Sequence, residues 1–343
     1  MNLTGQRFFD LLAIGRVSNL PTVWSNMVTG ILLAWALQNQ EMPFSAGLQP
    51  LLLIAGVTSA YLFGTFLNDW KDVDFDTRHR PERAIPSGRW SRSSIGWMAA
   101  GFALAALGCF LSQVFTQPLV PILGVALLAS IVIYTALHKR TPFAIIPMGI
   151  CRSLLYLLGY CSVASVPVTN PTATSGNPEG SIPGILQDNA LFIVVLMALG
   201  ILSYVAGLTL AARYESGPAN LPLPRIILWV PIFLCALTHT WWWICQHPLF
   251  LGDRPLVIPA LLCLLPFCIW TVRALSAIRK SIGDFVSRAL AGLCLVDLLA
   301  FAGIATTIRT GWSALDANPL VLTLIPLSCF LFSLLLQRIA PAT

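Results

Sequence analysis

FLNDWKDVDFDTRHRPERAIPSG, residues 66–88, combines both signs of charge at the end of a nearly uncharged stretch. It holds four aspartates, one glutamate, one lysine and three arginines, whereas only 10% of the whole chain is charged and 57% is hydrophobic. Soluble domains average roughly 25% charged residues. A chain this apolar is therefore expected to lie mostly in lipid, where such a charged block needs a reason.

Outside this block the chain divides into ten apolar runs, several of them near twenty residues long. A helix of about 20 residues crosses a hydrocarbon core of about 30 Å, whereas barrel strands would alternate over roughly ten residues. We therefore predict an all-α, polytopic transmembrane bundle of nine to ten spans. The runs are 22–38, 49–67, 94–114, 117–137, 143–163, 189–212, 224–245, 255–275, 285–307 and 318–337.

The basic residues alternate between loops in a way that predicts orientation. If the N-terminus is inside, 17 of the 20 Lys and Arg residues lie in inside segments, and only Arg254 and Arg309 lie outside. Cytoplasmic loops carry this excess of positive charge. We expect both termini in the cytoplasm of a prokaryotic inner (plasma) membrane, which also explains the net charge of +6 without nucleic acid.

The chain is predicted to be a single membrane domain, 1–343, made of two halves. The segment 164–188 is rich in Pro, Gly, Ser, Thr and Asn, and is typical of an extracytoplasmic linker. It separates a first half, 1–163, from a second half, 189–343. The nine cysteines lie mostly in apolar runs and form no CxxC pair, so we interpret them as small packing residues.

Within the charged block, the aspartates are arranged by helical spacing. If the helix continues through the block, Asp69, Asp72 and Asp76 share an arc of about 60°, with Asn68 at its edge and Asp74 on the other side. Like charges on one face repel each other. A hard cation such as Mg²⁺ would remove this conflict and leave coordination sites for phosphate oxygens.

Arginines follow the aspartates directly, and guanidinium groups bind phosphate in a bidentate manner. The acidic face with Arg78, Arg80, Arg83 and Arg89 therefore suits a magnesium-bound diphosphate. The alternative is a solvated cytoplasmic loop whose arginines only set topology, but topology requires no aspartates.

Two further places carry unexpected charge. Lys139 and Arg140 separate two apolar runs, where they are either topological anchors or functional groups. Arg152 lies about half way along the fifth run, where a charge is costly unless it faces a polar cavity, so we expect it to have a role in a ligand pocket. For Asp297, in the ninth run, a polar contact between helices is the simpler interpretation.

A weak internal repeat relates the first charged motif to the second half. YLFGTFLNDWKD (61–72) aligns with YVAGLTLAARYE (204–215), so that Tyr61 matches Tyr204 and Gly64 matches Gly207. Asp72 matches Glu215, whereas the other acidic positions align with alanine. Two pseudo-repeated halves are therefore predicted.

These motifs resemble those of the UbiA-type intramembrane prenyltransferases. NDWKDVDFD fits the family's NDxxDxxxD, RPERAIPSG is similar to RPxRPIxSG, YTALHKR is similar to YSxxLKR, and Arg16 with Asn19 resembles an opening RxxN. The resemblance implies a helical bundle with a central cavity, Mg²⁺ bound by two acidic motifs, an isoprenyl diphosphate donor and a lipophilic, usually aromatic, acceptor.

The second acidic motif departs from this pattern. The family has DxxxD or DxxDxxxD after the sixth run, whereas AARYESG keeps only Glu215. Together with GICRSLLYLLG (149–159), this reduced motif resembles the EboC-like branch. A second magnesium and the usual aromatic acceptor are therefore less firmly implied than the donor, and a lipid or sugar acceptor stays open.

The expected function is prenyl transfer with magnesium-assisted departure of diphosphate. The alternative is a non-catalytic binder or transporter of isoprenoid diphosphates. The resemblance implies catalytic roles for Asp69, Asp72 and Asp76. It implies metal binding by Asn68, Asp69, Asp72, Asp76 and Glu215. The residues expected to bind diphosphate are Arg16, Asn19, Arg80, Arg83, Lys139, Arg140, Arg152 and Arg213.

Overall fold

The computed structural model describes residues 3–38, 48–163, 190–214, 226–246, 254–278, 280–311 and 319–340. Over these residues the chain is helical and contains no strand, and each of the ten predicted apolar runs forms a helix. The predicted linker 164–188 lies outside the described residues. The helices are α1 Leu3–Ile14, α2 Leu20–Gln38, α3 Gln49–Lys71, α4 Val73–His79, α5 Arg92–Leu111, α6 Leu119–Leu137, α7 Ile145–Cys161, α9 Ala190–Ala212, α10 Ile226–Gln246, α11 Arg254–Ala277, α12 Ile282–Gly311 and α13 Pro319–Gln337.

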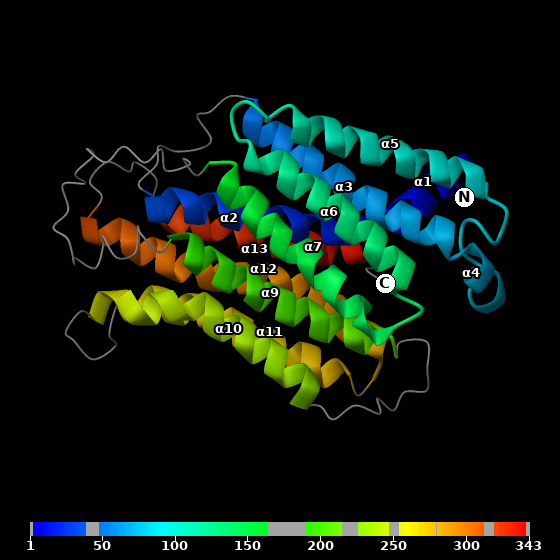
Figure 1. The fold of residues 1–343 in the computed structure, drawn as a ribbon. Coiled ribbons are helices and arrows are strands. Elements are labelled where there is room, and N and C mark those ends of the chain that lie inside the picture. The colour runs from blue at the N-terminus through cyan, green and yellow to red at the C-terminus, as the bar shows by residue number, and fades with distance from the viewer. Residues whose placement is uncertain are drawn as a thin grey trace.

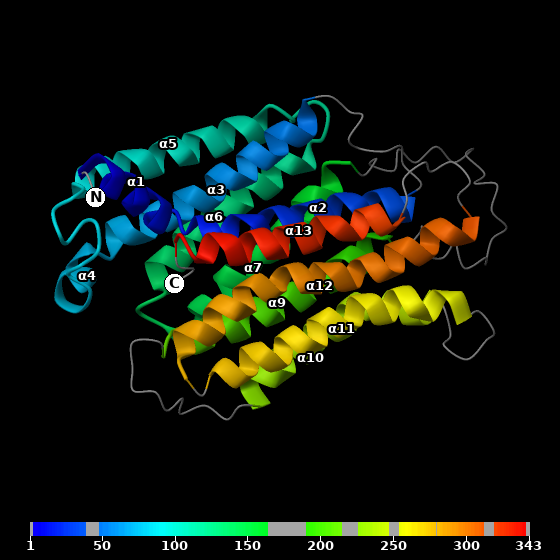
Figure 2. The same ribbon diagram turned by 180° about the vertical axis from the view of Figure 1, so that it is seen from behind.

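The long helices run side by side along one axis of an elongated bundle (Figure 1). The two labelled chain ends and the short helix α4 lie toward the same end of this bundle, and the view from behind agrees (Figure 2). This placement is what an even number of crossings with both termini on one side would produce.

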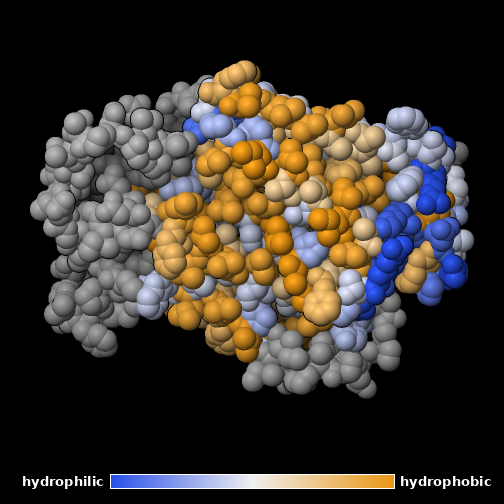
Figure 3. Space-filling model, in the orientation of Figure 1, coloured by the Kyte–Doolittle hydropathy of each residue, from blue (hydrophilic) through white to orange (hydrophobic). Residues whose placement is uncertain are grey.

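Six helices within the described residues are long and apolar enough to cross a membrane: Val17–Leu37, Gln49–Lys71, Arg92–Leu111, Leu119–Leu137, Pro142–Cys161 and Ala190–Ala212. Large apolar side chains such as Trp97 and Leu104 on α5 are exposed, as lipid-facing residues would be. Figure 3 shows a broad apolar surface over the middle of the bundle and a hydrophilic cluster near α4. The protein is therefore a multi-pass membrane protein.

Helix α2 forms the centre of the bundle. Nearly all of its residues are buried, and it contacts α3, α7, α9, α12 and α13. Its buried face is not purely apolar, because Thr22, Ser25, Asn26 and Thr29 are also buried. Polar side chains inside a membrane bundle need partners on neighbouring helices. Helix α2 is thus the axis from which polar contacts reach the other helices.

The helix does not continue unbroken through the aspartates, which was the condition for their shared arc. Helix α3 ends at Lys71, Asp72 has φ −83° and ψ 3°, and α4 begins at Val73. The break separates the acidic residues onto two helices, Asp69 on α3 and Asp76 on α4. They nevertheless stay together, because the loop that follows α4 folds back and brings Arg83 to both of them.

Candidate active site

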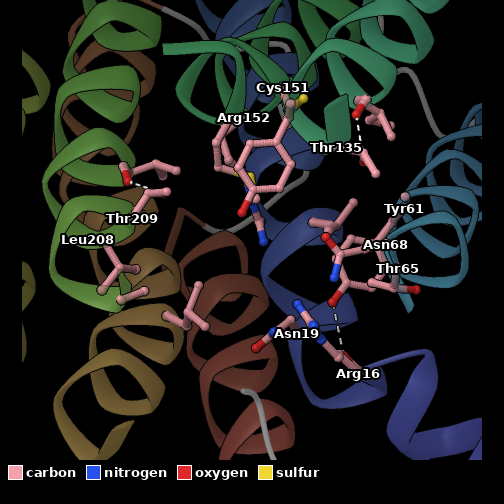
Figure 4. Close-up of a pocket in the computed structure, with 18 of the residues that line it drawn as sticks. Arg16, Asn19, Tyr61, Thr65, Asn68, Thr135, Cys151, Arg152, Leu208 and Thr209 are labelled. Atoms are coloured by element: carbon pink, nitrogen blue, oxygen red, sulfur yellow. Dashed lines mark hydrogen bonds between the residues drawn. The ribbon is translucent and has the colours of Figure 1, made fainter. Parts of the chain in front are cut away.

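A cavity of about 260 Å³ opens among α2, α3, α6, α7, α9 and α12. One part of its wall is polar and includes Arg16, Asn19, Asn68, Arg80 and Arg83. The other part is mainly apolar, with Val23, Val57, Leu127, Ile131, Leu155, Leu208, Val286 and Leu290. A ligand with a charged head and an apolar tail matches this division (Figure 4).

The predicted aspartates lie beside the polar wall and are paired with cations. Asp69 Oδ1 is 3.7 Å from both Arg16 Nη2 and Arg83 Nη1, and Asp76 Oδ2 accepts a hydrogen bond of 2.9 Å from Arg83 Nη1. Asp72 Oδ1 is 2.9 Å from Lys139 Nζ. Three carboxylates are thus matched by three cations, and this group is electrically neutral before any ligand binds.

Asp72 is held by two residues of the loop that follows α6. Besides Lys139, His138 Nε2 lies 3.2 Å from Asp72 Oδ2. Burial raises the pKa of Asp72, but the hydrogen bonds and the electrostatic attraction of His138 and Lys139 together outweigh this effect, so the pKa lies below its usual value. Lys139 Nζ also lies 3.7 Å from the centre of the Phe75 ring, a cation–π contact. Asp72 is therefore kept ionised at neutral pH.

Arg16 occupies an unusual backbone conformation at the entrance to α2. Its φ of 42° places a non-glycine residue in the left-handed region, which costs energy unless the surroundings hold it. Its carbonyl accepts hydrogen bonds from Tyr61 Oη at 3.0 Å and from Asn19 N at 2.9 Å. Burial lowers the pKa of the guanidinium, but Asp69 together with Tyr61, Tyr134 and Asp72 outweighs this effect and raises it. These contacts aim a permanently charged group at the cavity.

The remaining predicted residues do not all reach the cavity. Arg80 lines it, whereas Arg140 is exposed and is not part of its wall. Arg213 donates to the carbonyls of His138 and Thr141, at 2.9 and 2.6 Å, so it fixes the loop that carries Lys139. Glu215 lies outside the described residues. Arg152 lines the cavity from α7, away from the aspartates.

Other polar residues line the cavity that the sequence analysis did not assign to the site. They are Tyr61 and Thr65 on α3, Tyr134 and Thr135 on α6, Cys151 on α7 and Thr209 on α9. In the sequence analysis, Tyr61 was named only because it matches Tyr204 in the internal repeat. There, Tyr61 Oη donates to the Arg16 carbonyl, and its counterpart Tyr204 Oη donates to the Ala289 carbonyl at 2.8 Å. Both tyrosines of the repeat thus bond a backbone carbonyl of a distant segment.

Comparison with known proteins identifies relatives. The model of the UbiA prenyltransferase family matches residues 23–281. Digeranylgeranylglyceryl phosphate synthase of Methanoregula boonei is 43% identical over 95 residues, which cover 27% of this chain and 32% of that protein. The synthase of Methanothrix thermoacetophila is 34% identical over 138 residues, covering 39% and 47%. The chain thus matches less than half the length of these curated relatives.

A solved structure of a digeranylgeranylglyceryl phosphate synthase shows the same fold. It aligns with 89% of this chain and 99% of its own, with a TM-score of 0.54 and 17% sequence identity. At this identity the likeness concerns the fold alone. The arrangement of the helices is therefore one already known from a solved structure.

Proposed function

Because the chain belongs to the UbiA prenyltransferase family, we propose that it transfers an isoprenyl group from a polyprenyl diphosphate to a lipophilic acceptor. One observation carries the proposal: Asp69, Asp72 and Asp76 lie with Arg16, Arg83 and Lys139 beside a cavity whose other walls are apolar. A prenyl diphosphate has the same division of charge. The named activity of the relatives is one such transfer, to a lipid acceptor.

The donor atoms of this group suit a hard divalent cation, which the family generally uses. Asn68 and the three aspartates offer oxygen ligands, and the buried Asp69 Oδ1 has no hydrogen bond. No three acidic, His or Cys side chains of the described ranges converge as a metal-binding group. Instead, Arg83 and Lys139 pair with the carboxylates. We propose Mg²⁺ at Asn68, Asp69, Asp72 and Asp76, with Glu215 as a candidate ligand from the second half.

Binding would exchange these ion pairs. With Mg²⁺ present, the carboxylates would hold the metal in place of their cations, and the metal would supply charge neutralisation to the diphosphate. The cations released from the carboxylates, with Arg80, then take phosphate oxygens. Asn19 can add an amide hydrogen bond beside Arg16. Arg140, which lies outside the cavity wall, contributes charge only from a distance, and Arg213 acts by holding the loop of Lys139.

The reaction breaks the bond between the allylic carbon and the diphosphate oxygen, and the electron pair leaves with the diphosphate. The acceptor then forms a bond to that carbon and loses a proton. Arg16, Arg83 and Lys139 stabilise the charge that develops on the leaving group, where fixed charges contribute most. Apolar walls such as Leu127, Ile131 and Leu208 keep water from the allylic cation.

The direct test is diphosphate release by the purified protein in lipid nanodiscs. Geranylgeranyl and longer polyprenyl diphosphates are supplied with a panel of aromatic, glycerol-lipid and sugar acceptors. We expect diphosphate release that requires Mg²⁺, stops with EDTA and resumes when Mg²⁺ is restored. Tight donor binding without release under every pairing would instead favour the non-catalytic binder or transporter.

The charge distribution leads to a prediction of topology. We propose that the end carrying α4 faces the cytoplasm of the inner (plasma) membrane, because most Lys and Arg residues gather at that end of the predicted spans. In a cysteine-free background, Arg78→Cys on α4 should react with an impermeant maleimide only after the cells are opened. Phe115→Cys, in the turn between α5 and α6, should react in intact spheroplasts. The reverse pattern would contradict the orientation.

A further inference from the structure

Arg152 lies apart from the ion pairs at the aspartates. Its Nη1 donates to Thr22 Oγ1 at 2.9 Å and to Asn26 Oδ1 at 3.2 Å, both on α2. Asn26 comes seven residues after Asn19, which is about 10 Å further along a helix. Figure 4 shows Arg152 entering the cavity from α7, whereas Arg16 and Asn19 enter from the segment before α2. The cavity therefore has two separate cationic sites, one at Arg152 and one near Arg16.

The charge of Arg152 is not neutralised directly. The residue is only 9% exposed, and no carboxylate of the described residues lies within ion-pair distance of it. A buried charge without a partner is costly, especially within a membrane bundle. Both of its hydrogen bonds go to neutral oxygens. A cation held in this way at a cavity wall is suited to an anionic ligand.

Asp297 on α12 determines how Asn26 faces Arg152. The Asn26 amide Nδ2 donates to both carboxylate oxygens of Asp297, at 3.0 Å each. Its carbonyl oxygen is thereby turned to Arg152. Asp297 also accepts hydrogen bonds from Ser25 and Tyr156, so its own position is fixed from α2 and α7. The sequence-based prediction of a polar contact between helices at Asp297 is confirmed by these bonds.

We infer that Arg152 is an anion subsite for the acceptor, so that the acceptor carries a carboxylate or phosphate beside its lipophilic part. The inference rests on the proposed prenyl transfer and narrows the expectation that Arg152 binds diphosphate. Asp297 is a positioning residue, because it acts on Arg152 only through the Asn26 amide. The donor diphosphate occupies the other cationic site, which contains Arg16, Arg83 and Lys139.

The test measures binding in detergent, in the presence of Mg²⁺ and the unreactive donor analogue geranylgeranyl thiodiphosphate. Dodecyl phosphate, dodecanoate and dodecanol have the same chain and differ in their head groups. We expect one or both anions to bind about tenfold or more tightly than the alcohol, since a charge-assisted hydrogen bond is worth that much. Comparing the two anions identifies which head group the subsite prefers.

Variants distinguish anion binding at Arg152 from donor binding at the other cationic site. Arg152→Gln should abolish the preference for the anions, leave dodecanol binding unchanged and leave binding of the donor analogue unchanged. Arg152→Lys should restore part of the preference. Asp297→Asn should weaken it, because a neutral amide no longer dictates the orientation of Asn26. Arg338→Gln, an exposed arginine outside the cavity wall, is the matched control and should behave as wild type.

Two results would overturn the inference: equal binding of anions and alcohol by the wild type, or a retained anion preference in Arg152→Gln. The wild-type comparison needs no variant, so a misfolded substitution does not prevent a decision. Failure of the proposed function has a different signature, because it is seen in turnover and not in binding. In that case no pairing of donor and acceptor releases diphosphate, whereas the preference among the three dodecyl compounds is still measured by binding.

Discussion

Asp69→Asn is expected to remove magnesium-dependent diphosphate release almost completely while leaving the donor bound. Asp69 is the carboxylate shared by Arg16 and Arg83, and its buried Oδ1 accepts no hydrogen bond, which is why we propose it as a metal ligand. A catalytic metal contributes several kcal/mol to the transition state. Because about 1.4 kcal/mol of barrier corresponds to a tenfold change in rate, the turnover rate should fall about 10³-fold. The fall in turnover rate is measured as steady-state diphosphate release.

Donor affinity should respond differently from turnover. Without the Asp69 charge, Arg16 and Arg83 lose part of their intramolecular neutralisation, so they remain available to phosphate oxygens. We therefore expect the dissociation constant of inorganic pyrophosphate, measured without Mg²⁺, to be unchanged or lower. This split between binding and turnover would not arise if the substitution simply disrupted the fold.

Asp74→Asn is the matched control for Asp69→Asn. Asp74 is an aspartate of the same motif, but it is exposed on the far side of α4. Its substitution should leave both diphosphate release and its Mg²⁺ dependence intact. Asp72→Asn and Asp76→Asn should resemble Asp69→Asn. Equal activity in Asp69→Asn and Asp74→Asn would show that the aspartate arrangement has no catalytic role.

The helices were predictable because lipid imposes a simple length rule. Each apolar run had to satisfy its backbone hydrogen bonds internally, so each of the ten runs became a helix. The break at Asp72 was not predictable in this way. The spacing of Asp69, Asp72 and Asp76 fits one continuous helix, whereas the observed geometry depends on Arg83 and Lys139, which come from later segments.

At the candidate site, too, local motifs could be predicted, whereas contacts between distant segments could not. Asn68 and the aspartates were identified because they form a compact local motif. Arg152 was identified because a charge in an apolar run is rare. The positioning role that we propose for Asp297 depends on Asn26, which is 271 positions away, and on the orientation of one amide. No local pattern contains that information, because it arises from the packing of α12 on α2.

The second large expected effect is a loss of stability at the contact between α2 and α7, where the two helices pack closely. A Cβ atom on Gly30 would lie 2.2 Å from the Tyr156 carbonyl oxygen, and one on Gly159 would lie 2.0 Å from the Met27 carbonyl oxygen. In both cases the obstacle is backbone, which cannot rotate away. Such small residues allow membrane helices to approach closely. Gly30→Ala and Gly159→Ala should each destabilise the protein by about 3 kcal/mol, the upper part of the overpacking range.

Unfolding in a series of detergent–denaturant mixtures measures this loss. The control is Gly101→Ala on α5, where a Cβ meets nothing within 4 Å; alanine there should be neutral or stabilise by up to about 1 kcal/mol. The double variant Gly30→Ala/Gly159→Ala should lose less than the sum of the single losses, because the first methyl already separates the helices. Strict additivity would contradict the shared contact. Since Arg152 on α7 bonds Thr22 and Asn26 on α2, the same separation should also weaken anion binding at Arg152.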